Sequence, residues 1–458
     1  MEMIYHIKDR PSFFKTLVFA FQQLLAILAA TIAVPAIINS IYETANMSQA
    51  AALFGAGVGT LVYLLFTKFK SPVFLGSSFA FLGSMQAAFA GAVSMSVGYL
   101  GLILGAFFAG LVYVILAIIV KFVGTKWIDK LMPPVVIGPT VAIIGLSLAG
   151  NAIGDLLKGG LADAEGVAIC SPYIALLCGL VTLIVTILCS VYGKKTLKMI
   201  PFIIGILAGY ILASIFTGIG YLSNNDSLKV INFELFNNMS WLPSFSFLEV
   251  FKGSFDFGNF NNIGSYIGSI AVAYVPVAFV VFAEHIADHK NLSAIIETDL
   301  LVDPGLDKTL LGDGVGSMVG AVFGGCPNTT YGESVGCIAI SQNASVITTV
   351  YTAILAIVIS FFGPFVTFLA TIPNCVMGGV CIALYGFIAV SGLKMIQNVD
   401  LNNNKNIFVV SVILIAGVGG LVISINTIKI TEVACALILG IIVNAICSKK
   451  SKNKEVNQ

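Results

Sequence analysis

The sequence contains little charge. Of its 458 residues, 10% are charged and 58% are hydrophobic, whereas a soluble domain carries about 25% charged residues. A chain of this composition cannot cover itself with an ordinary hydrated surface. Long apolar runs recur from Phe13 to Cys447, and such runs are typical of a polytopic membrane protein. The net charge of +1 gives no indication of nucleic-acid binding.

Metal-ligating and catalytic motifs are also missing from the sequence. It has three histidines, and its nine cysteines form no CxxC pair, so neither a metal site nor a cofactor is indicated. The cysteines are interpreted as small buried hydrophobic residues. Walker A, HExxH and GxSxG motifs are absent, which gives no support for an ATPase, a metalloprotease or a hydrolase. The sequence therefore does not indicate an enzyme.

Apolar segments long enough to cross a bilayer, or nearly so, number about fourteen when counted with a window of about 20 residues. We expect an all-α protein in which the ninth and tenth segments are individually short. The expected segments are 16–38, 49–67, 72–92, 97–120, 133–150, 172–192, 199–219, 266–287, 310–325, 328–341, 345–371, 376–395, 406–424 and 430–447.

The distribution of basic residues supports this count. With both termini in the cytoplasm, all but four of the 23 basic residues fall on the cytoplasmic side; the exceptions are Lys158, Lys229, Lys252 and Lys429. The positive-inside rule predicts such an asymmetry. No signal-peptide cleavage site is found in the N-terminal 15 residues. We expect a multi-pass protein of the cell membrane with both termini cytoplasmic.

Two of the segments start with a break. Segment ten begins within Gly325–Glu333, which holds a proline, two glycines and a carboxylate, and segment three begins with Ser71–Phe79. Because the external loop of residues 221–262 divides the chain into two sets of seven spans, these breaks occupy equivalent positions. A matched pair of interrupted segments indicates a transporter site at a repeat interface, and an odd number of spans per half requires that the repeats be inverted.

Acidic residues inside apolar segments are the main candidates for function. Glu284 lies at the end of the run Ile270–Ala283, and Asp288 follows on the same helical face. Burial disfavours the charged form of a carboxyl group, so Glu284 is a candidate for proton exchange. The alternative is a glutamate at the membrane boundary that pairs with His285, His289 or Lys290.

Four further polar residues allow two interpretations each. Glu333 either faces a ligand at the start of a half-helix or closes a capping box with Thr330. Asp313, which glycines flank, is either a functional carboxylate or a polar loop residue. Gln22 and Gln23 either hydrogen-bond a ligand or join helices.

A resemblance to a known family rests on six short motifs. They are Leu75–Phe81, Ala283–His285, Asp303–Leu306, Pro327–Glu333, Met377–Gly379 and Leu384–Gly386. In them the chain resembles the nucleobase–ascorbate transporter family, and within it the bacterial uracil permeases. The resemblance implies fourteen spans in two inverted seven-span repeats, with short strands in spans three and ten. It also implies a core domain (1–131 and 266–371), a gate domain (132–265 and 372–458) and possible dimers through the gate.

The resemblance also assigns residues to a substrate site. Glu284 and Glu333 match the two carboxylates that bind the base, and Glu284 is also linked to proton coupling. Asp288 takes the place of a histidine found in some uracil permeases, and we expect it to take part in coupling. The remaining matches line the base pocket: Ala30, Phe79, Tyr331, Gly332 and Tyr385.

Together these expectations describe a secondary transporter that imports uracil with protons by alternating access. A purine (xanthine or urate) symporter is an alternative, as is an anion exchanger or channel of related architecture. Two acidic residues at the site argue against an anion pocket.

Overall fold

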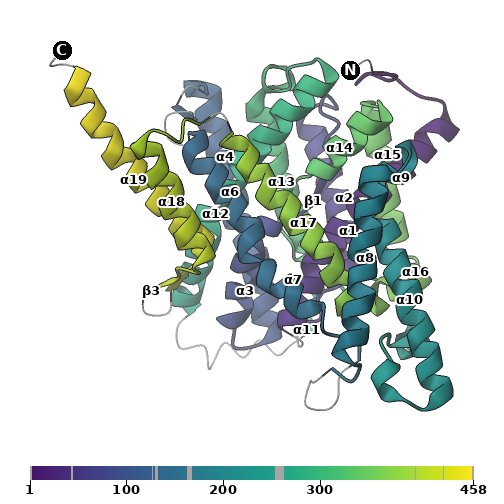
Figure 1. Ribbon diagram of the computed structural model, residues 1–458. Helices are drawn as coiled ribbons and strands as arrows, with labels where there is room; N and C mark the ends of the chain where they lie inside the picture. Colours follow the sequence, from purple (N-terminus) through teal and green to yellow (C-terminus); the bar gives the residue numbers. More distant parts are fainter. Residues whose placement is uncertain are drawn as a thin grey trace.

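The computed structural model describes residues 3–42, 45–125, 127–128, 133–161, 168–252, 263–397, 399–425 and 428–455. Its long helices run roughly side by side (Figure 1). The first half of the chain supplies seven segments, two of which are composite: β1 (Leu75–Ser77) leads through η1 (Phe79–Phe81) into α3 (Leu82–Ala90), and α6 (Pro134–Ser147) continues as α7 (Ala149–Asp155). The others are α1 (Phe13–Ile41), α2 (Gln49–Phe66), α4 (Met95–Val123), α8 (Pro172–Tyr192) and α10 (Pro201–Ser223).

The second half repeats this order. A strand again precedes a short helix, here β2 (Asn328–Thr330) and α14 (Gly332–Ser341), and a bent pair follows, α15 (Val346–Ile359) and α16 (Gly363–Thr371). The other segments are α12 (Ile263–Ile296), α13 (Leu306–Gly324), α17 (Asn374–Met395), α18 (Asn404–Val418) and α19 (Glu432–Glu455). The connections hold α9 (Lys195–Met199), η2 (Asp226–Leu228), η3 (Phe233–Asn238), α11 (Ser246–Lys252), η5 (Leu301–Gly305), β3 (Ile423–Ile425) and β4 (Ile428–Ile430).

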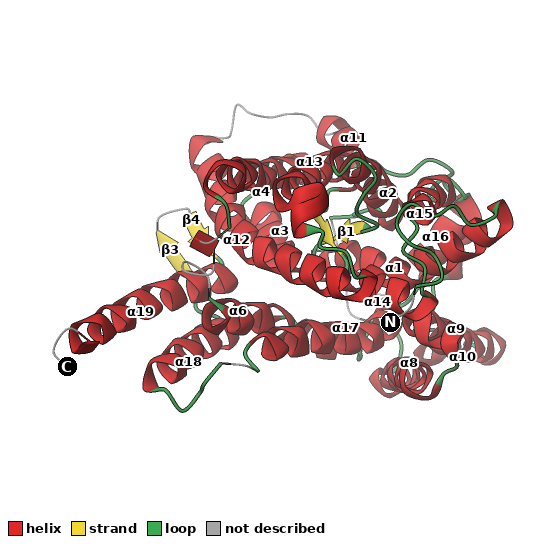
Figure 2. Cartoon of the chain, turned by 90° about the horizontal axis from the view of Figure 1, so that it is seen from above, coloured by secondary structure: helices red, strands yellow, loops and turns green. Residues whose placement is uncertain are grey.

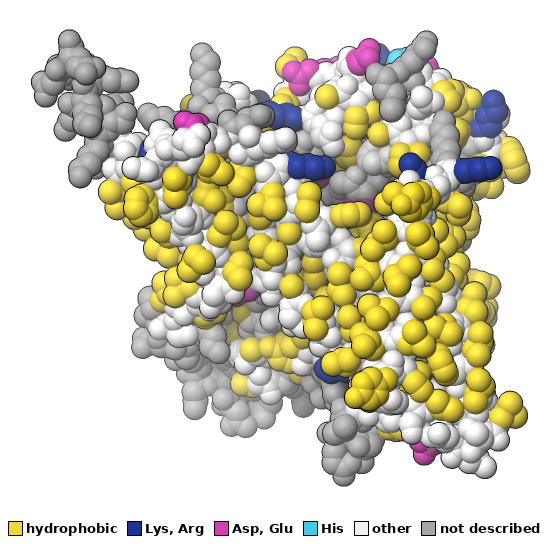
Figure 3. Space-filling view, in the orientation of Figure 1, with side chains coloured by type: hydrophobic (Ala, Val, Ile, Leu, Met, Phe, Trp, Pro, Cys, Tyr) yellow, Lys and Arg dark blue, Asp and Glu magenta, His cyan; other side chains and the backbone are white. Residues whose placement is uncertain are grey.

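Helix length and composition fit a bilayer. Within the described residues, eight helices are long and apolar enough to cross a membrane, and α15 and α16 form a further pair bent by 83°. Apolar side chains are spread over the middle of the face seen in Figure 3. Most of the Lys and Arg side chains on that face lie toward its upper rim, the side at which α1 begins and α19 ends in Figure 1. Lys126 and Lys130 lie outside the described residues.

The pattern of helix contacts shows that the two halves are related. Exchanging each segment with its counterpart seven positions along converts one set of contacts into the other. The α2–α13 contact maps onto itself, α4–α13 maps onto α2–α15, and α1–α14 maps onto α3–α12. Likewise α8–α10 maps onto α18–α19, and α8–α17 maps onto α6–α18. Since each half has seven segments, the second half starts from the opposite side, and the repeat is inverted. The expectation of about fourteen segments in two inverted repeats, with strands breaking the third and tenth, is confirmed.

Seen from above, the helices form two groups (Figure 2). One side holds α6, α8, α10, α17, α18 and α19, and the other holds α1 to α4 and α12 to α16. The expected boundary between residues 131 and 132 lies outside the described residues. The assignment of these groups to a core and a gate stays a prediction.

The strands β1 and β2 pair antiparallel, with Leu75 opposite Thr330 and Ser77 opposite Asn328. Strand edges inside a membrane are costly unless their backbone groups find partners. Here side chains from neighbouring helices supply them: Leu75 N–H donates to Thr60 Oγ1 at 2.9 Å, and Asn328 N–H donates to Ser317 Oγ at 2.9 Å. The crossing is therefore held from both helices, α2 and α13, against which it lies.

Glycine permits close approach at the crossing. The ring of Tyr331 lies against Gly76 at the position where a Cβ atom would be. Its hydroxyl donates to the carbonyl of Ser77 at 2.8 Å. Any larger residue at position 76 would displace this ring.

Candidate functional site

A cavity of about 320 Å³ lies between the two helix groups. Its volume is at the lower end of the range for small-molecule sites. On one side the lining comes from α1, α12 and α14, and on the other from α6, α8, α9, α10 and α17. Lys198 on α9 and Met395 at the end of α17 are among the lining residues. The cavity thus extends toward the side of the molecule on which most of the basic residues lie.

Three carboxyl groups line this cavity: Glu284, Asp288 and Glu333. Glu284 and Asp288 are one turn apart on α12 and share a face, while Glu333 comes from the first turn of α14. All three are half-buried. The Thr330 hydroxyl donates to Asp288 Oδ2 at 2.7 Å, which ties this face of α12 to β2. Gly332 lies beside them and is exposed to the cavity.

The capping box considered for Glu333 does not form. Helix α14 is preceded by Tyr331, which makes no side-chain cap, and the hydroxyl of Thr330 is directed to Asp288 instead. The first N–H groups of a helix have no intrahelical acceptor and carry the positive end of its dipole. The start of α14 therefore offers hydrogen-bond donors next to the carboxylates.

The histidines near Glu284 have other partners. His285 Nδ1 is 2.7 Å from Asp313 Oδ2, and His289 Nε2 is 2.8 Å from the hydroxyl of Tyr63. The pairing of Glu284 with either histidine is therefore not formed. Asp313 lies inside α13 and is 1% exposed, so its interpretation as a loop residue is wrong. Gln23 joins helices: its amide nitrogen donates to Ser334 Oγ, and its carbonyl accepts from Thr352.

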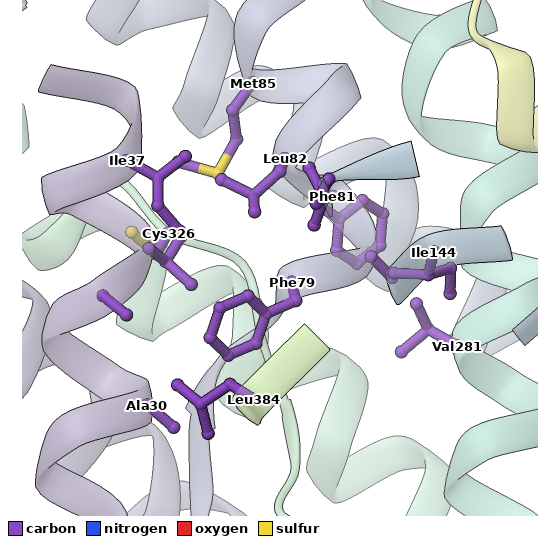
Figure 4. Close-up of a cluster of buried hydrophobic side chains, with 14 of the residues drawn as sticks. Ala30, Ile37, Phe79, Phe81, Leu82, Met85, Ile144, Val281, Cys326 and Leu384 are labelled. Carbon is purple, nitrogen blue, oxygen red and sulfur yellow. The ribbon is translucent and has the colours of Figure 1, made fainter. Parts of the chain in front are cut away.

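The remaining expected site residues lie in the apolar cluster rather than on the cavity wall. Phe79 and Tyr385 make an edge-to-face contact at 5.9 Å between ring centroids. In Figure 4, Phe79 lies close to Ala30 and Leu384. The side chain of Tyr331 is turned toward β1 through its bond to Ser77. Of the seven expected substrate-binding residues, the cavity brings together Glu284, Gly332 and Glu333.

One wall of the cavity was missed by sequence reasoning. Helix α17 contributes Phe387, Ser391 and Met395, and α10 contributes Phe202. The α17 residues are spaced four apart and share one helical face. A serine within an otherwise apolar stripe is the signal that distinguishes this face. Within the described residues, no group of three or more His, Cys, Asp or Glu side chains is arranged to hold a metal ion.

Comparison with known proteins identifies the family. Residues 14–425 match the model of the Permease family. The chain is 36% identical over 444 residues to the uracil permease of Bacillus subtilis (strain 168), covering 96% of this chain and 94% of that protein. It is 34% identical over 438 residues to the uracil permease of Escherichia coli (strain K12), covering 95% and 92% of the two chains.

Among solved structures, the fold is similar to the transmembrane domain of the cyanobacterial bicarbonate transporter BicA. The TM-score is 0.62 at 15% identity, with 96% of this chain and 99% of that one covered. The murine anion transporter Slc26a9 gives a TM-score of 0.62 at 11% identity, covering 97% and 69%. These structural similarities concern the fold alone, whereas the sequence matches identify the family. The chain belongs to the nucleobase–ascorbate transporter family of permeases.

Proposed function

We propose that this protein is a secondary transporter that imports uracil together with protons. The observation that carries the proposal is the convergence of Glu284, Asp288 and Glu333 on one cavity between two groups of helices. The relatives that are more than 30% identical over nearly their whole length and are named uracil permeases support the substrate.

The chemistry of the cavity complements a pyrimidine base. Uracil presents two N–H donors and two carbonyl acceptors around a flat ring. Carboxylates accept from the N–H groups, and backbone N–H groups at the start of α14 can donate to a carbonyl. A hydrogen bond to an ionised carboxylate is stronger than a neutral one, whereas protonated Glu284 accepts through its carbonyl oxygen. Phe202 and Phe387 supply flat apolar surface for the ring faces.

Proton coupling follows from the position of Glu284. An ionised carboxylate is costly within a bilayer, so a site that changes its exposure from one side to the other moves most easily with Glu284 neutral. In the proposed cycle Glu284 takes a proton outside, the base binds to Glu284 and Glu333, and release inside frees the proton. Asp288 modulates this exchange through its bond to Thr330.

Movement of the two helix groups against each other provides alternating access. We assign residues 1–131 and 266–371 to the core and residues 132–265 and 372–458 to the gate, with dimers forming through the gate. The cavity then opens to the cytoplasm, where the basic residues and both termini lie. Phe79, Ala30 and Tyr385 close the site on the opposite side and contact the base when it is bound.

The fold alone does not select the substrate. The structural neighbours include anion transporters, but three carboxyl groups around the cavity disfavour an anionic ligand. A purine symporter is the closer alternative within the family. The family resemblance implies that purine transporters often have glutamine at the position of Glu333, so this glutamate supports the pyrimidine.

The test is uptake of radiolabelled uracil into proteoliposomes, with and without an inward proton gradient and in sodium-free buffer. Concentrative uptake that requires the gradient is the expected result. Equilibration without concentration would contradict proton coupling. Stronger competition by unlabelled xanthine than by unlabelled uracil would reassign the substrate to purines.

A further inference from the structure

A chain of buried hydrogen bonds runs behind the carboxylate face of α12. Asp313 on α13 contacts His285 Nδ1 at 2.7 Å, and the backbone carbonyl of His285 contacts His289 Nδ1 at 2.8 Å. His289 Nε2 contacts the hydroxyl of Tyr63 on α2 at 2.8 Å, and that hydroxyl contacts Ser71 Oγ at 2.7 Å. All five side chains are 0 to 1% exposed.

The hydrogen-bonding partners determine where the protons lie. His289 Nδ1 faces a carbonyl, which only accepts, so this nitrogen carries the proton. The Tyr63 hydroxyl donates to Ser71 Oγ. His289 Nε2 lies 2.8 Å from the same hydroxyl, so Tyr63 links the histidine to Ser71.

The chain and the cavity use two adjacent faces of one helix. His285 and His289 are four residues apart, and their rings stack at 4.1 Å between centroids. Glu284 and Asp288 have the same spacing, each one residue earlier, and line the cavity. A step of one residue turns an α-helix by about 100°. Whatever fixes the direction of the histidines therefore fixes the direction of the carboxylates.

We propose that Asp313, His285, His289, Tyr63 and Ser71 form a positioning element that sets the rotation of α12 about its own axis, so that Glu284 and Asp288 face the cavity. The element binds α12 to α13 on one side and to α2 on the other. It deepens the proposed function, because it assigns a role in uracil binding to residues that do not touch the base.

Asp313→Leu and Tyr63→Phe are the test variants. Leaving a buried polar group without a partner has a substantial energetic cost, and we expect about tenfold weaker equilibrium binding of radiolabelled uracil for Asp313→Leu. Asp313→Asn keeps an acceptor for His285 and should bind within about threefold of the parent. Tyr99→Phe is the matched control. The Tyr99 hydroxyl is also buried, but it donates to the backbone carbonyl of Ala45 at 2.6 Å and takes no part in the hydrogen-bond chain of α12.

A second measurement needs no substrate. Ala287 lines the cavity, so in a Cys337→Ala background an Ala287→Cys variant should react with a small water-soluble thiol reagent. Adding Asp313→Leu should lower this labelling rate several-fold, as α12 turns, while Asp313→Asn and Tyr99→Phe leave it unchanged. If Asp313→Leu does not fold, Tyr63→Phe, which keeps the ring, carries the same comparison.

The two measurements separate this inference from the proposed function. A parent protein that does not bind uracil overturns the substrate assignment, and the labelling comparison still tests the positioning role. Folded variants that label at position 287 at the parental rate overturn the positioning element, whether or not uracil binds. Weaker binding with lowered labelling, rescued by Asp313→Asn, supports it.

Discussion

At the scale of single residues, the cavity carboxylates have distinct surroundings. Asp288 accepts a hydrogen bond from Thr330, and Glu333 lies in the first turn of α14. Glu284 faces the cavity without either histidine as a partner, since Asp313 and Tyr63 engage them. This difference makes Glu284 the group best placed to exchange a proton with solvent.

Replacing Glu284 by Gln should abolish accumulation of uracil driven by a proton gradient, because the amide can bind the base but cannot carry the proton. We expect at least a tenfold loss of concentrative uptake in proteoliposomes, in line with the size of proton-transfer effects. Glu297→Gln, just beyond the end of the same helix and exposed, should transport normally. Gradient-driven accumulation by Glu284→Gln at the parental level would refute the assignment.

The sequence predicted some of these residues and not others, for a physical reason. An acidic residue in an apolar run is energetically costly in a membrane and therefore indicates a functional site. This placed Glu284, Glu333 and Asp313 among the candidates. What each carboxyl group contacts depends on side chains more than 20 residues away. The Thr330 hydroxyl, for example, is directed to Asp288 rather than to a capping box. The aromatic residues Phe202 and Phe387 were missed because single apolar residues do not stand out in apolar helices.

At the scale of elements, hydrogen bonds constrain the strand crossing on both sides. Its hydrogen bonds extend beyond the paired strands, since Ser78 N–H donates to Pro327 O and Tyr331 N–H donates to Phe74 O. The two breaks were predictable because proline and glycine interrupt both segments. The two short strands were expected only from the family resemblance, since pairing between residues remote in sequence leaves no local signal.

Gly76→Ala should destabilise the protein by about 1 to 3 kcal/mol, because the new methyl group overlaps the Tyr331 ring. Thermal unfolding in detergent measures the effect. Tyr331→Leu should lose stability by itself, but combining it with Gly76→Ala should cost less than the sum of the two single changes. Additive effects would show that the ring and Gly76 are not in contact. Gly150→Ala, with open space around its Cβ position, is the matched control.

The loop between α12 and α13 supplies a pH-dependent contact. The hydrogen bond from Lys70, at 2.6 Å, lowers the pKa of Asp303 below its usual value. A lowered folded-state pKa means that the contact stabilises the protein above the usual aspartate pKa and is lost as the pH falls through the lowered value. Asp303→Asn should lower the melting temperature slightly at pH 7. It should have no effect at a pH below the lowered pKa of Asp303, where the carboxyl group is protonated. A difference that grows on acidification would contradict the ion pair.

At the scale of the whole molecule, the proposed cycle requires the two helix groups to move against each other. Met199 on α9 and Cys337 on α14 belong to opposite walls of the cavity and pack into one small apolar cluster with Ala26. In the proposed cycle this contact breaks when the two groups move.

A Met199→Cys variant treated with a short bifunctional methanethiosulfonate should therefore lose uracil uptake by linking to Cys337, and reduction should restore it. Uptake into proteoliposomes before and after reduction is the measurement. The same reagent on Met199→Cys with Cys337→Ala controls for modification of a single thiol. Full transport by the linked protein would mean that these walls do not separate during the cycle.

The crossing of β1 and β2 also has a consequence for biogenesis. Residues 78–327 must be synthesised after β1 and before β2 emerges. During this time the strand edge that will meet β2 has no partner, and an unsatisfied backbone group in lipid costs several kcal/mol. Until then the first half stays incomplete, and the unpaired backbone groups of β1 must be hydrogen-bonded by water or covered by the insertion machinery or by neighbouring helices. A chain truncated before Asn328 cannot form the strand crossing, so the cavity beside it is completed only late in translation.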